Sequence, residues 1–365
     1  MTLGYGVDLA IHEIASRLAT THAMEVDVWT PTSDGTYSHA PYALREIIVY
    51  GAPVNRILPL LELNAWRALR QLRQRLDAGG ERYDVVVPCT HPYYCAGAAL
   101  GSPSVFFNFG NVPTTGFTWK RKLNWAWLSF SDDVLWKPRA ARVVSISRFL
   151  HEQQGAEARR RGVVVHLGGD HYATADPDAR RTFRTAHGIP EDAVVLGYCG
   201  RLHREHAPYK GTTEVLALGR RIHEVEPRVV LAMCGVGSST DAAWIMSEGA
   251  MPLANLPPSE MPGFYSALDV YVCASRWEGF NLPIVEAAWH SVPAVAYDTA
   301  AHHEHVAAVL VAPGDFDALC SAALTLARDD ALRGRMGEQA RDRAPWFCWD
   351  RTAAAFAAVI LEASR

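Results

Sequence analysis

The most informative part of this 365-residue chain is the stretch Arg276-Trp277-Glu278-Gly279-Phe280-Asn281-Leu282-Pro283-Ile284-Val285-Glu286-Ala287-Ala288. It follows the apolar run Val270–Cys273, which is typical of a buried strand. Pro283 has no backbone N–H group and suits the first turn of a helix. A helix is therefore expected over 283–290, and the stretch predicts a strand, a short loop and a helix in succession.

Two carboxylates flank the expected start of this helix. Glu278 lies in the loop, Glu286 lies early in the helix, and both are expected at the surface. Between them, the N–H groups near Asn281 and Leu282 lack helical partners, and such helix N-termini attract anions. A diphosphate held by this backbone would have an acid on either side to accept hydrogen bonds from sugar hydroxyls. Taken singly, each glutamate is equally consistent with an ordinary surface residue, since acids are common in first helical turns.

Short apolar runs alternate with amphipathic stretches along the whole chain, which is typical of βα units and a parallel sheet. The expected strands are 25–29, 84–88, 104–107, 141–145, 163–166, 193–199, 228–234, 270–273, 292–297 and 309–311. The expected helices are 7–20, 176–187, 212–225, 283–290, 316–328, 330–343 and 349–362. The series restarts after Asp170, which places a domain boundary near 164–172.

Composition narrows the class of protein. A formal net charge of −4 gives no support for bulk electrostatic binding to nucleic acid. The sequence has no apolar run of about 18 residues and no basic-then-apolar start typical of a signal peptide. The cysteines are odd in number, have no C-x-x-C spacing and lie partly in apolar runs, which favours core residues in a reducing compartment. We therefore expect a cytoplasmic protein.

The whole string resembles the E-x7-E motif of the family-4 retaining glycosyltransferases, with Glu278 and Glu286 as its two acids. The resemblance covers nearly the whole chain. It implies the GT-B architecture, an α/β fold with two Rossmann-like α/β/α domains facing a cleft. The implied domains are 1–167 on the acceptor side, 168–345 on the nucleotide-sugar side, and 346–365 as a C-terminal helix packing back toward the first domain.

A second element resembles the family's G-R-L…K-G pattern, namely Gly200-Arg201-Leu202 followed by Lys210-Gly211. In the family, this Arg and Lys neutralise the donor diphosphate, the role that a metal has in other transferases. Arg201 and Lys210 are therefore expected to be catalytic together with Glu278. The intervening segment 203–209 is longer than in the family pattern. Without the resemblance, Arg201 is equally consistent with a plain loop cation.

The remaining donor contacts follow from the same resemblance. They are Phe280, Asn281, Leu282 and Glu286 of the motif, Gly235 of a G-x-G loop near the nucleobase, and Gly6 of a Gly-rich loop at 4–7. On sequence alone, the Gly-rich loop is equally consistent with a flexible terminus. The donor is expected to be UDP- or GDP-linked, and the acceptor is open.

The chain departs from the family where a histidine is usual, because Phe109 occupies that position. Asn108 and Asn111 flank it and are candidates for a hydrogen bond to a sugar hydroxyl. His91 ends the preceding strand and either contacts the acceptor or caps Pro92. This departure leaves open a non-catalytic nucleotide-sugar-binding protein, and a sugar-nucleotide epimerase of the same fold is the other alternative.

No metal and no other cofactor is expected. Asp176-Pro177-Asp178 has the D-x-D form of metal-dependent transferases, but it lies in the linker, where Asp followed by Pro is a normal helix start. The segment 117–136 combines tryptophans with Lys120, Arg121 and Lys122. It predicts either a helix packed on the first domain or a weak peripheral membrane contact. We favour the packed helix because Asp132 and Asp133 would interrupt a basic face.

The residues before the Gly-rich loop are too few for the strand that normally precedes it in a βαβ domain. Because that strand is central, we expect the natural protein to begin further upstream. The alternative is a sheet that closes without it, with 25–29 as an edge.

Overall fold

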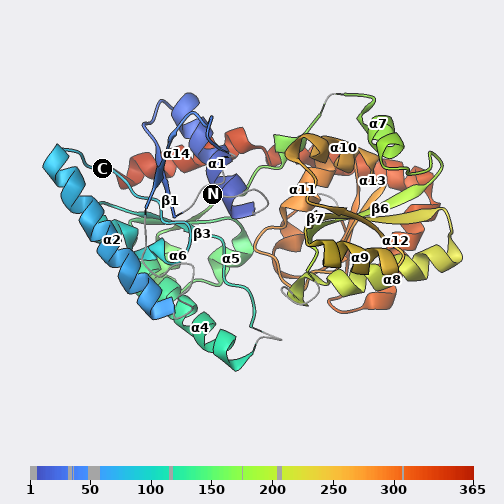
Figure 1. The fold of residues 1–365 in the computed structure, drawn as a ribbon, viewed down its shortest axis with the longest axis horizontal. Helices are drawn as coiled ribbons and strands as arrows, with labels where there is room; N and C mark the ends of the chain where they lie inside the picture. The colour runs from blue at the N-terminus through green and yellow to red at the C-terminus, as the bar shows by residue number, and fades with distance from the viewer. Residues whose placement is uncertain are drawn as a thin grey trace. The chain divides into compact units, whose positions relative to one another are not determined.

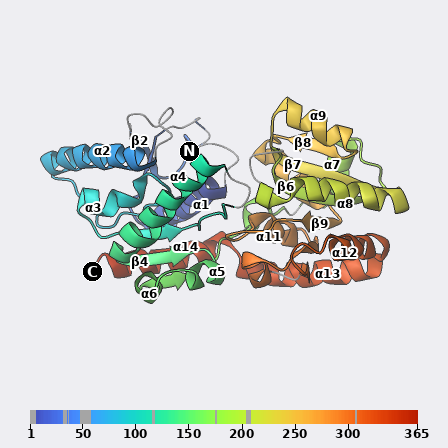
Figure 2. The same ribbon diagram turned by 90° about the horizontal axis from the view of Figure 1, so that it is seen from below.

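The computed structural model describes residues 6–31, 35, 37–47, 58–114, 118–174, 176–203, 208–305 and 308–365. The chain divides into two compact units. Unit 1 comprises Met1–Leu167 together with Asp350–Arg365, and unit 2 comprises Gly168–Trp349. Both are built from parallel strands and helices (Figures 1 and 2). The C-terminal helix is thus part of the same unit as the N-terminal residues.

Unit 2 contains a six-stranded sheet with the strand order β11-β10-β9-β6-β7-β8, and every pairing in it is parallel. The chain moves outward from β6 through β7 to β8 and then returns to β9 on the other side of β6. The strand order therefore reverses between β6 and β9, and in such sheets ligands bind beyond the carboxyl ends of the strands at this point. The strands are β6 (Val194–Arg201), β7 (Val229–Val236), β8 (Met251–Ala254), β9 (Val270–Cys273), β10 (Ala294–Tyr297) and β11 (Ala308–Val311).

Helices cover both faces of this sheet (Figure 1). Apolar side chains of β6, β7, β9 and β10 form a buried core with those of α8 and α12. The helices are α7 (Ala179–Ala186), α8 (Thr212–Val225), α9 (Ser239–Ser247), α10 (Met261–Ala267), α11 (Leu282–Trp289), α12 (Phe316–Arg328) and α13 (Asp330–Arg343). The short helices are η4 (Asp170–Tyr172), η5 (Pro208–Lys210), η6 (Pro258–Glu260), η7 (Ala300–Glu304) and η8 (Ala344–Trp346).

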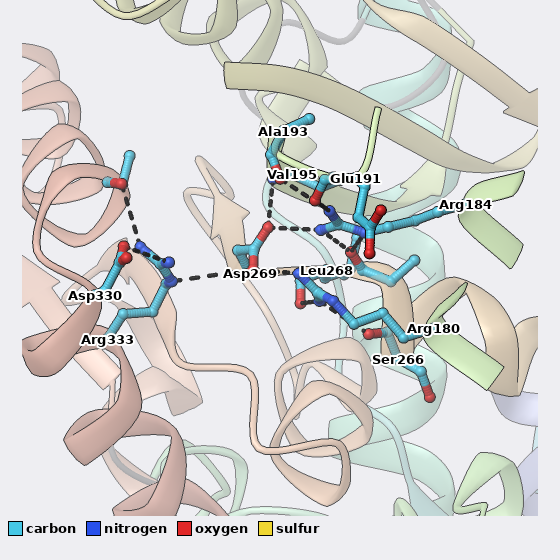
Figure 3. Close-up of polar contacts among 12 residues, drawn as sticks. Arg180, Arg184, Glu191, Ala193, Val195, Ser266, Leu268, Asp269, Asp330 and Arg333 are labelled. Carbon is cyan, nitrogen blue, oxygen red and sulfur yellow. Dashed lines mark hydrogen bonds and ion pairs between the residues drawn. The ribbon is translucent and has the colours of Figure 1, made fainter. Parts of the chain in front are cut away.

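A charged cluster fixes the amino-terminal end of this sheet (Figure 3). Asp269, directly before β9, accepts hydrogen bonds from Arg180 and Arg184 of α7 at 2.7 and 2.8 Å and from the N–H of Val195 at 2.7 Å. Arg184 is only 4% exposed and also donates to the carbonyl oxygens of Ala193 and Ala267. The cluster thus ties α7, β6 and β9 together at the sheet edge opposite the carboxyl ends.

Unit 1 contains two hydrogen-bonded parallel sheets, β1-β2 and β3-β4-β5. Its strands are β1 (Asp27–Thr30), β2 (Ala43–Glu46), β3 (Val105–Asn108), β4 (Arg142–Ser145) and β5 (Gly162–Val164). Its helices are α1 (Gly6–Thr20), α2 (Leu58–Gly79), α3 (Ala96–Leu100), α4 (Trp119–Phe130), α5 (Arg148–Glu152), α6 (Ala156–Arg160) and α14 (Trp349–Ala363), with short helices η1 (Tyr93–Cys95), η2 (Ser131–Trp136) and η3 (Lys137–Arg139).

The predicted strand 84–88 is reduced to an isolated bridge between Val86 and Ser104. Val86 donates to Pro103 and accepts from Val105, and the carbonyl of Pro88 accepts from Phe107. The next bond of the ladder would need an N–H group at Pro88, which proline lacks. The prediction of a full strand here is therefore wrong.

β1 pairs with β2, and the segment 86–88 is bonded to β3. Residues 4 and 5 of the predicted Gly-rich loop lie outside the described part of the chain, and Gly6 is the first residue of α1.

Candidate functional site

The predicted loop and helix follow β9 at the switch point of unit 2. Glu278 lies in the loop, α11 begins at Leu282, and Pro283 is in its first turn, as predicted. Contrary to the prediction of surface positions, both acids of the motif are buried: Glu278 is 7% exposed and Glu286 is 4% exposed. The reason is that each carboxylate is enclosed by donors from other elements of the unit.

Lys210 and Glu278 form an ion pair at this point. Lys210 Nζ lies 2.8 Å from both carboxylate oxygens of Glu278, although 68 residues separate the two in sequence. Burial lowers the pKa of Lys210, but the charge of Glu278 raises it, and the net pKa is above the ordinary lysine value. Lys210 is therefore a fixed cation at neutral pH and not a base.

A glycine lets the segment that carries Lys210 reach the loop. Gly211 has a φ of +66°, and a Cβ there would lie 2.3 Å from the carbonyl oxygen of Ala274. Only glycine permits both the conformation and the close approach. The N–H of Arg276 then donates to the carbonyl oxygen of Tyr209 at 2.7 Å, which joins η5 to the loop. The long insertion thus leaves Lys210 within reach of Glu278; its residues 204–207 lie outside the described part.

Two aromatic residues from other segments lie against the carboxylate of Glu286. The hydroxyl of Tyr265 on α10 donates to Glu286 Oε2, and His171 Nε2 of η4 lies 3.0 Å from Oε1. Trp349 Nε1 donates to His171 Nδ1 at 3.0 Å, so the proton of a neutral His171 is on Nε2, facing Glu286. Glu286 lies in the second turn of α11, whereas the sequence predicts it in the first turn.

The remaining motif residues differ in how they face the site. The side chain of Phe280 is buried against His305 and Phe347, so its backbone is the part left for a ligand. Asn281 is the N-cap of α11, yet its side chain makes no capping bond. Leu282 is the first helical residue.

Arg201 and Gly235 lie at the carboxyl ends of neighbouring strands. Arg201 ends β6 and its side chain is exposed, while Gly235 lies near the end of β7. A Cβ on Gly235 would meet the carbonyl oxygen of Gly200 at 1.7 Å, so the two strands approach too closely there for any other residue. Gly6 belongs to the other unit.

Phe109 of unit 1 occupies the position where the family usually has a histidine, and the residues around it make contacts within that unit. Asn108 is buried, donates to Ser145 Oγ at 3.1 Å and accepts from the N–H of Gly110. Asn111 donates to Asp132 at 2.9 Å. Phe109 packs on Phe107. The amide of Asn108 is thus used to join β3 to β4.

The aromatic segment has two different parts. Trp127 and Trp136 donate to the buried carboxylate of Glu62 on α2, which matches the packed-helix interpretation. Trp119 is 67% exposed beside Lys120. Phe117 lies outside the described residues.

Asp132 does not interrupt a basic face, because it is buried and paired with Lys137 at 2.9 Å. The reason given for favouring the packed helix is therefore wrong for Asp132, whereas Asp133 is exposed. A weak peripheral membrane contact stays a prediction. None of the helices in the described ranges is sufficiently long and apolar to span a bilayer.

The D-x-D triplet is used locally. Asp176 accepts from the N–H of Asp178 at 2.9 Å, and Asp178 pairs with Arg181 at 2.8 Å. These contacts are those of a helix start, in the place where the linker meets α7.

Two Rossmann-like units of parallel strands and helices define the GT-B class of fold. Solved structures similar over nearly the whole chain agree. Anabaena HepE in complex with UDP and glucose has a TM-score of 0.77 at 16% identity and covers 98% of this chain and 96% of its own. Sucrose-phosphate synthase from Thermosynechococcus elongatus has a TM-score of 0.76 at 18% identity, with coverages of 98% and 93%.

The sequence comparisons narrow the class to a family. The model "Glycosyltransferase Family 4" matches residues 5–170, and "Glycosyl transferases group 1" matches 193–329. The chain belongs to the family-4 glycosyltransferases. D-inositol 3-phosphate glycosyltransferases are similar to it: that of Corynebacterium urealyticum is 29% identical over 55% of this chain and 51% of its own length. The enzyme of Saccharomonospora viridis is 30% identical over 51% of this chain and 47% of its own length. The chain thus spans about half the length of the curated relatives that it matches.

Proposed function

We propose that the protein transfers a sugar from a UDP- or GDP-linked donor to an acceptor hydroxyl, with retention of configuration and without a metal. The observation that carries the proposal is the ion pair of Lys210 and Glu278 at the switch point of unit 2. This pair supports the proposal because it combines a lysine cation with a carboxylate of the loop that precedes α11, and in this proposal the N-terminus of α11 binds the diphosphate.

In this proposal the protein stabilises the departing nucleotide. As the bond between the sugar carbon and the phosphate oxygen breaks, negative charge grows on the diphosphate. Lys210, Arg201 and the N–H groups at the start of α11 face that charge, and fixed donors of this kind replace a metal. Glu278 positions the donor sugar, and Glu286 binds the ribose.

Retention follows if the acceptor attacks on the face from which the nucleotide leaves. The acceptor oxygen bonds to the sugar carbon, and its proton moves to an oxygen of the leaving phosphate. No protein nucleophile is required, and the two acids of the motif remain binding groups. Uracil is the donor base supported by the similar HepE structures, which contain UDP and glucose or UDP-glucose.

The acceptor stays open. The relatives' names specify D-inositol 3-phosphate, and a phosphorylated polyol is therefore one acceptor to test. A cytoplasmic location stays part of the proposal, supported by seven cysteines that are all free thiols.

Activity is expected to be unchanged by EDTA, because Lys210 supplies the charge that Mg²⁺ or Mn²⁺ would otherwise provide. Purified protein is incubated with UDP-glucose or GDP-mannose and a panel of sugar and polyol-phosphate acceptors, with and without chelator. Nucleotide release is measured, and proton NMR assigns the anomer of the product. Loss of activity with EDTA and recovery with Mn²⁺ would contradict metal independence, and an inverted anomer would contradict retention.

Donor binding without transfer would favour a binding protein, and epimerised sugar without acceptor would favour an epimerase.

Glu286→Gln is expected to weaken nucleotide binding about tenfold, the effect of roughly one hydrogen bond to a charged group. Turnover at saturating donor should change little, because the ribose is bound equally in ground and transition states. Glutamine keeps the volume and one acceptor oxygen for Tyr265, so the fold is retained. Isothermal titration with UDP and GDP measures the affinity. Glu338→Gln, an exposed acid on α13, is the matched control. Unchanged affinity in Glu286→Gln would remove Glu286 from the donor site.

A further inference from the structure

Asn281 has an unusual conformation for a residue at the start of a helix. Its φ is +67°, in the left-handed region that is costly for residues other than glycine. As the N-cap of α11, it would ordinarily turn its side chain toward the N–H groups of the first turn. Instead the amide points into the unit, where Nδ2 lies 2.8 Å from His302 Nε2 and 3.3 Å from Cys273 Sγ. Something other than capping therefore holds this backbone.

His302 is the partner that fixes the amide. It is fully buried in η7, and its Nδ1 lies 2.7 Å from the carbonyl oxygen of Tyr297. Since a carbonyl only accepts, Nδ1 carries a proton, and Nε2 of the neutral ring accepts from Asn281. Burial lowers the pKa of His302, while Cys273 raises it, with a net upward direction. A protonated ring keeps the bond if the amide turns over, so that its oxygen accepts from Nε2.

The short helix η7 also contacts the other end of the loop. The N–H of Ala301 donates to the carbonyl oxygen of Glu278 at 3.4 Å. The backbone of Glu278 and the side chain of Asn281 are thus both bonded to the same short helix. A shift of η7 would displace both ends of the segment expected to contact the donor.

A metal site is the competing interpretation of this cluster. Cys273, Glu278 and His302 offer sulfur, oxygen and nitrogen atoms within 4.8 Å of one another, a donor set suited to Zn²⁺. However, the amide N–H groups of Asn281 face the sulfur and the nitrogen, and Lys210 faces both oxygens. All three donors already have N–H partners, which favours a hydrogen-bond network.

We propose that His302 is a positioning residue that holds Asn281 in its left-handed conformation and thereby directs the N–H groups at the start of α11 toward the donor diphosphate. The inference deepens the proposed function, on which it rests. It also explains how asparagine, and not glycine, can hold a positive φ at this position: the side-chain bond to His302 offsets the cost of the backbone conformation.

The test compares two replacements of His302. In His302→Asn, the side-chain amide N–H replaces the Nδ1–H group that donates to the carbonyl oxygen of Tyr297. Nothing replaces Nε2, which accepts from Asn281. His302→Gln reaches the position of Nε2 and keeps the bond to Asn281. We expect His302→Asn to lower kcat/KM about tenfold and His302→Gln to recover most of it. His303→Asn, the exposed neighbour in η7, is the matched control and should match the wild type.

A double-mutant cycle separates positioning from general damage. Glycine adopts a positive φ without strain, so in the Asn281→Gly background His302→Asn should have no further effect on kcat/KM. Equal effects of His302→Asn in both backgrounds would overturn the proposal.

Amide hydrogen exchange of the peptide covering 279–286 tests the inference without any activity. Exchange should be faster in His302→Asn than in the wild type or His303→Asn, and equal rates would overturn the inference. If the wild type releases no nucleotide from UDP-glucose or GDP-mannose, the proposed function fails while this readout still stands. Zn²⁺ that raises the melting temperature of the wild type but not of Cys273→Ser would overturn the network in favour of a cation site.

Discussion

Lys210→Ala is expected to slow transfer by a factor of about 100 or more, the usual cost of removing one group that stabilises transition-state charge. The cation lies 2.8 Å from both oxygens of Glu278 and remains protonated at neutral pH. Its loss removes positive charge from the departing diphosphate. Initial rates of nucleotide release at saturating donor measure the effect. Arg201→Ala is expected to slow transfer by a similar factor if Arg201 and Lys210 both stabilise the charge on the departing diphosphate.

The same substitution also leaves the buried carboxylate of Glu278 without its partner, which destabilises the unit by itself. The double variant Lys210→Ala/Glu278→Gln separates the two effects, because it has no unpaired charge. Its melting temperature should recover toward the wild type while its rate stays low. Arg276→Ala is the matched control, since Arg276 is an exposed cation of the same loop. A Lys210→Ala rate above one tenth of the wild-type rate would contradict the assignment.

The site was predictable where its residues are contiguous in sequence. The loop and helix from Glu278 to Glu286 follow from Pro283 and the preceding apolar strand. The burial of both acids was not predictable, because Tyr265 and Lys210 lie far from them in sequence and meet them only in the folded sheet. The effect of the insertion was equally hidden, since it depends on a positive φ at Gly211.

The fold was predictable where strands form apolar runs. β6, β7 and β9 were expected to within two residues of their observed bounds. The edge strands β2 and β8 were missed because their sequences, ALRE and MPLA, lack the composition typical of strands. They are strands because they pair with β1 and β7, an interaction that no local pattern encodes.

Asp269→Asn is expected to lower the free energy of unfolding of unit 2 by about 3–5 kcal/mol, the range for breaking one partner of a buried ion pair. Arg184 is 4% exposed and would keep its charge without a carboxylate, and the N–H of Val195 would lose a charged acceptor. Nothing in the sequence around Asp269 marks it, since its partners lie on α7 and β6. The cluster lies at the amino-terminal edge of the sheet, so nucleotide affinity of the folded protein should be unchanged.

Hydrogen exchange of peptides from β6 and β9 measures this loss, because it reports the stability of unit 2 separately from unit 1. Asp330→Asn is the matched control: Asp330 pairs with Arg333 at 2.7 Å at the surface, where such pairs contribute about 1 kcal/mol or less. Arg184→Met in the Asp269→Asn background should restore part of the loss, since it removes the uncompensated charge while keeping the buried stem. If the single and double variants were equally unstable, the lost bond from the N–H of Val195 to Asp269, and not the uncompensated charge of Arg184, would account for the destabilisation.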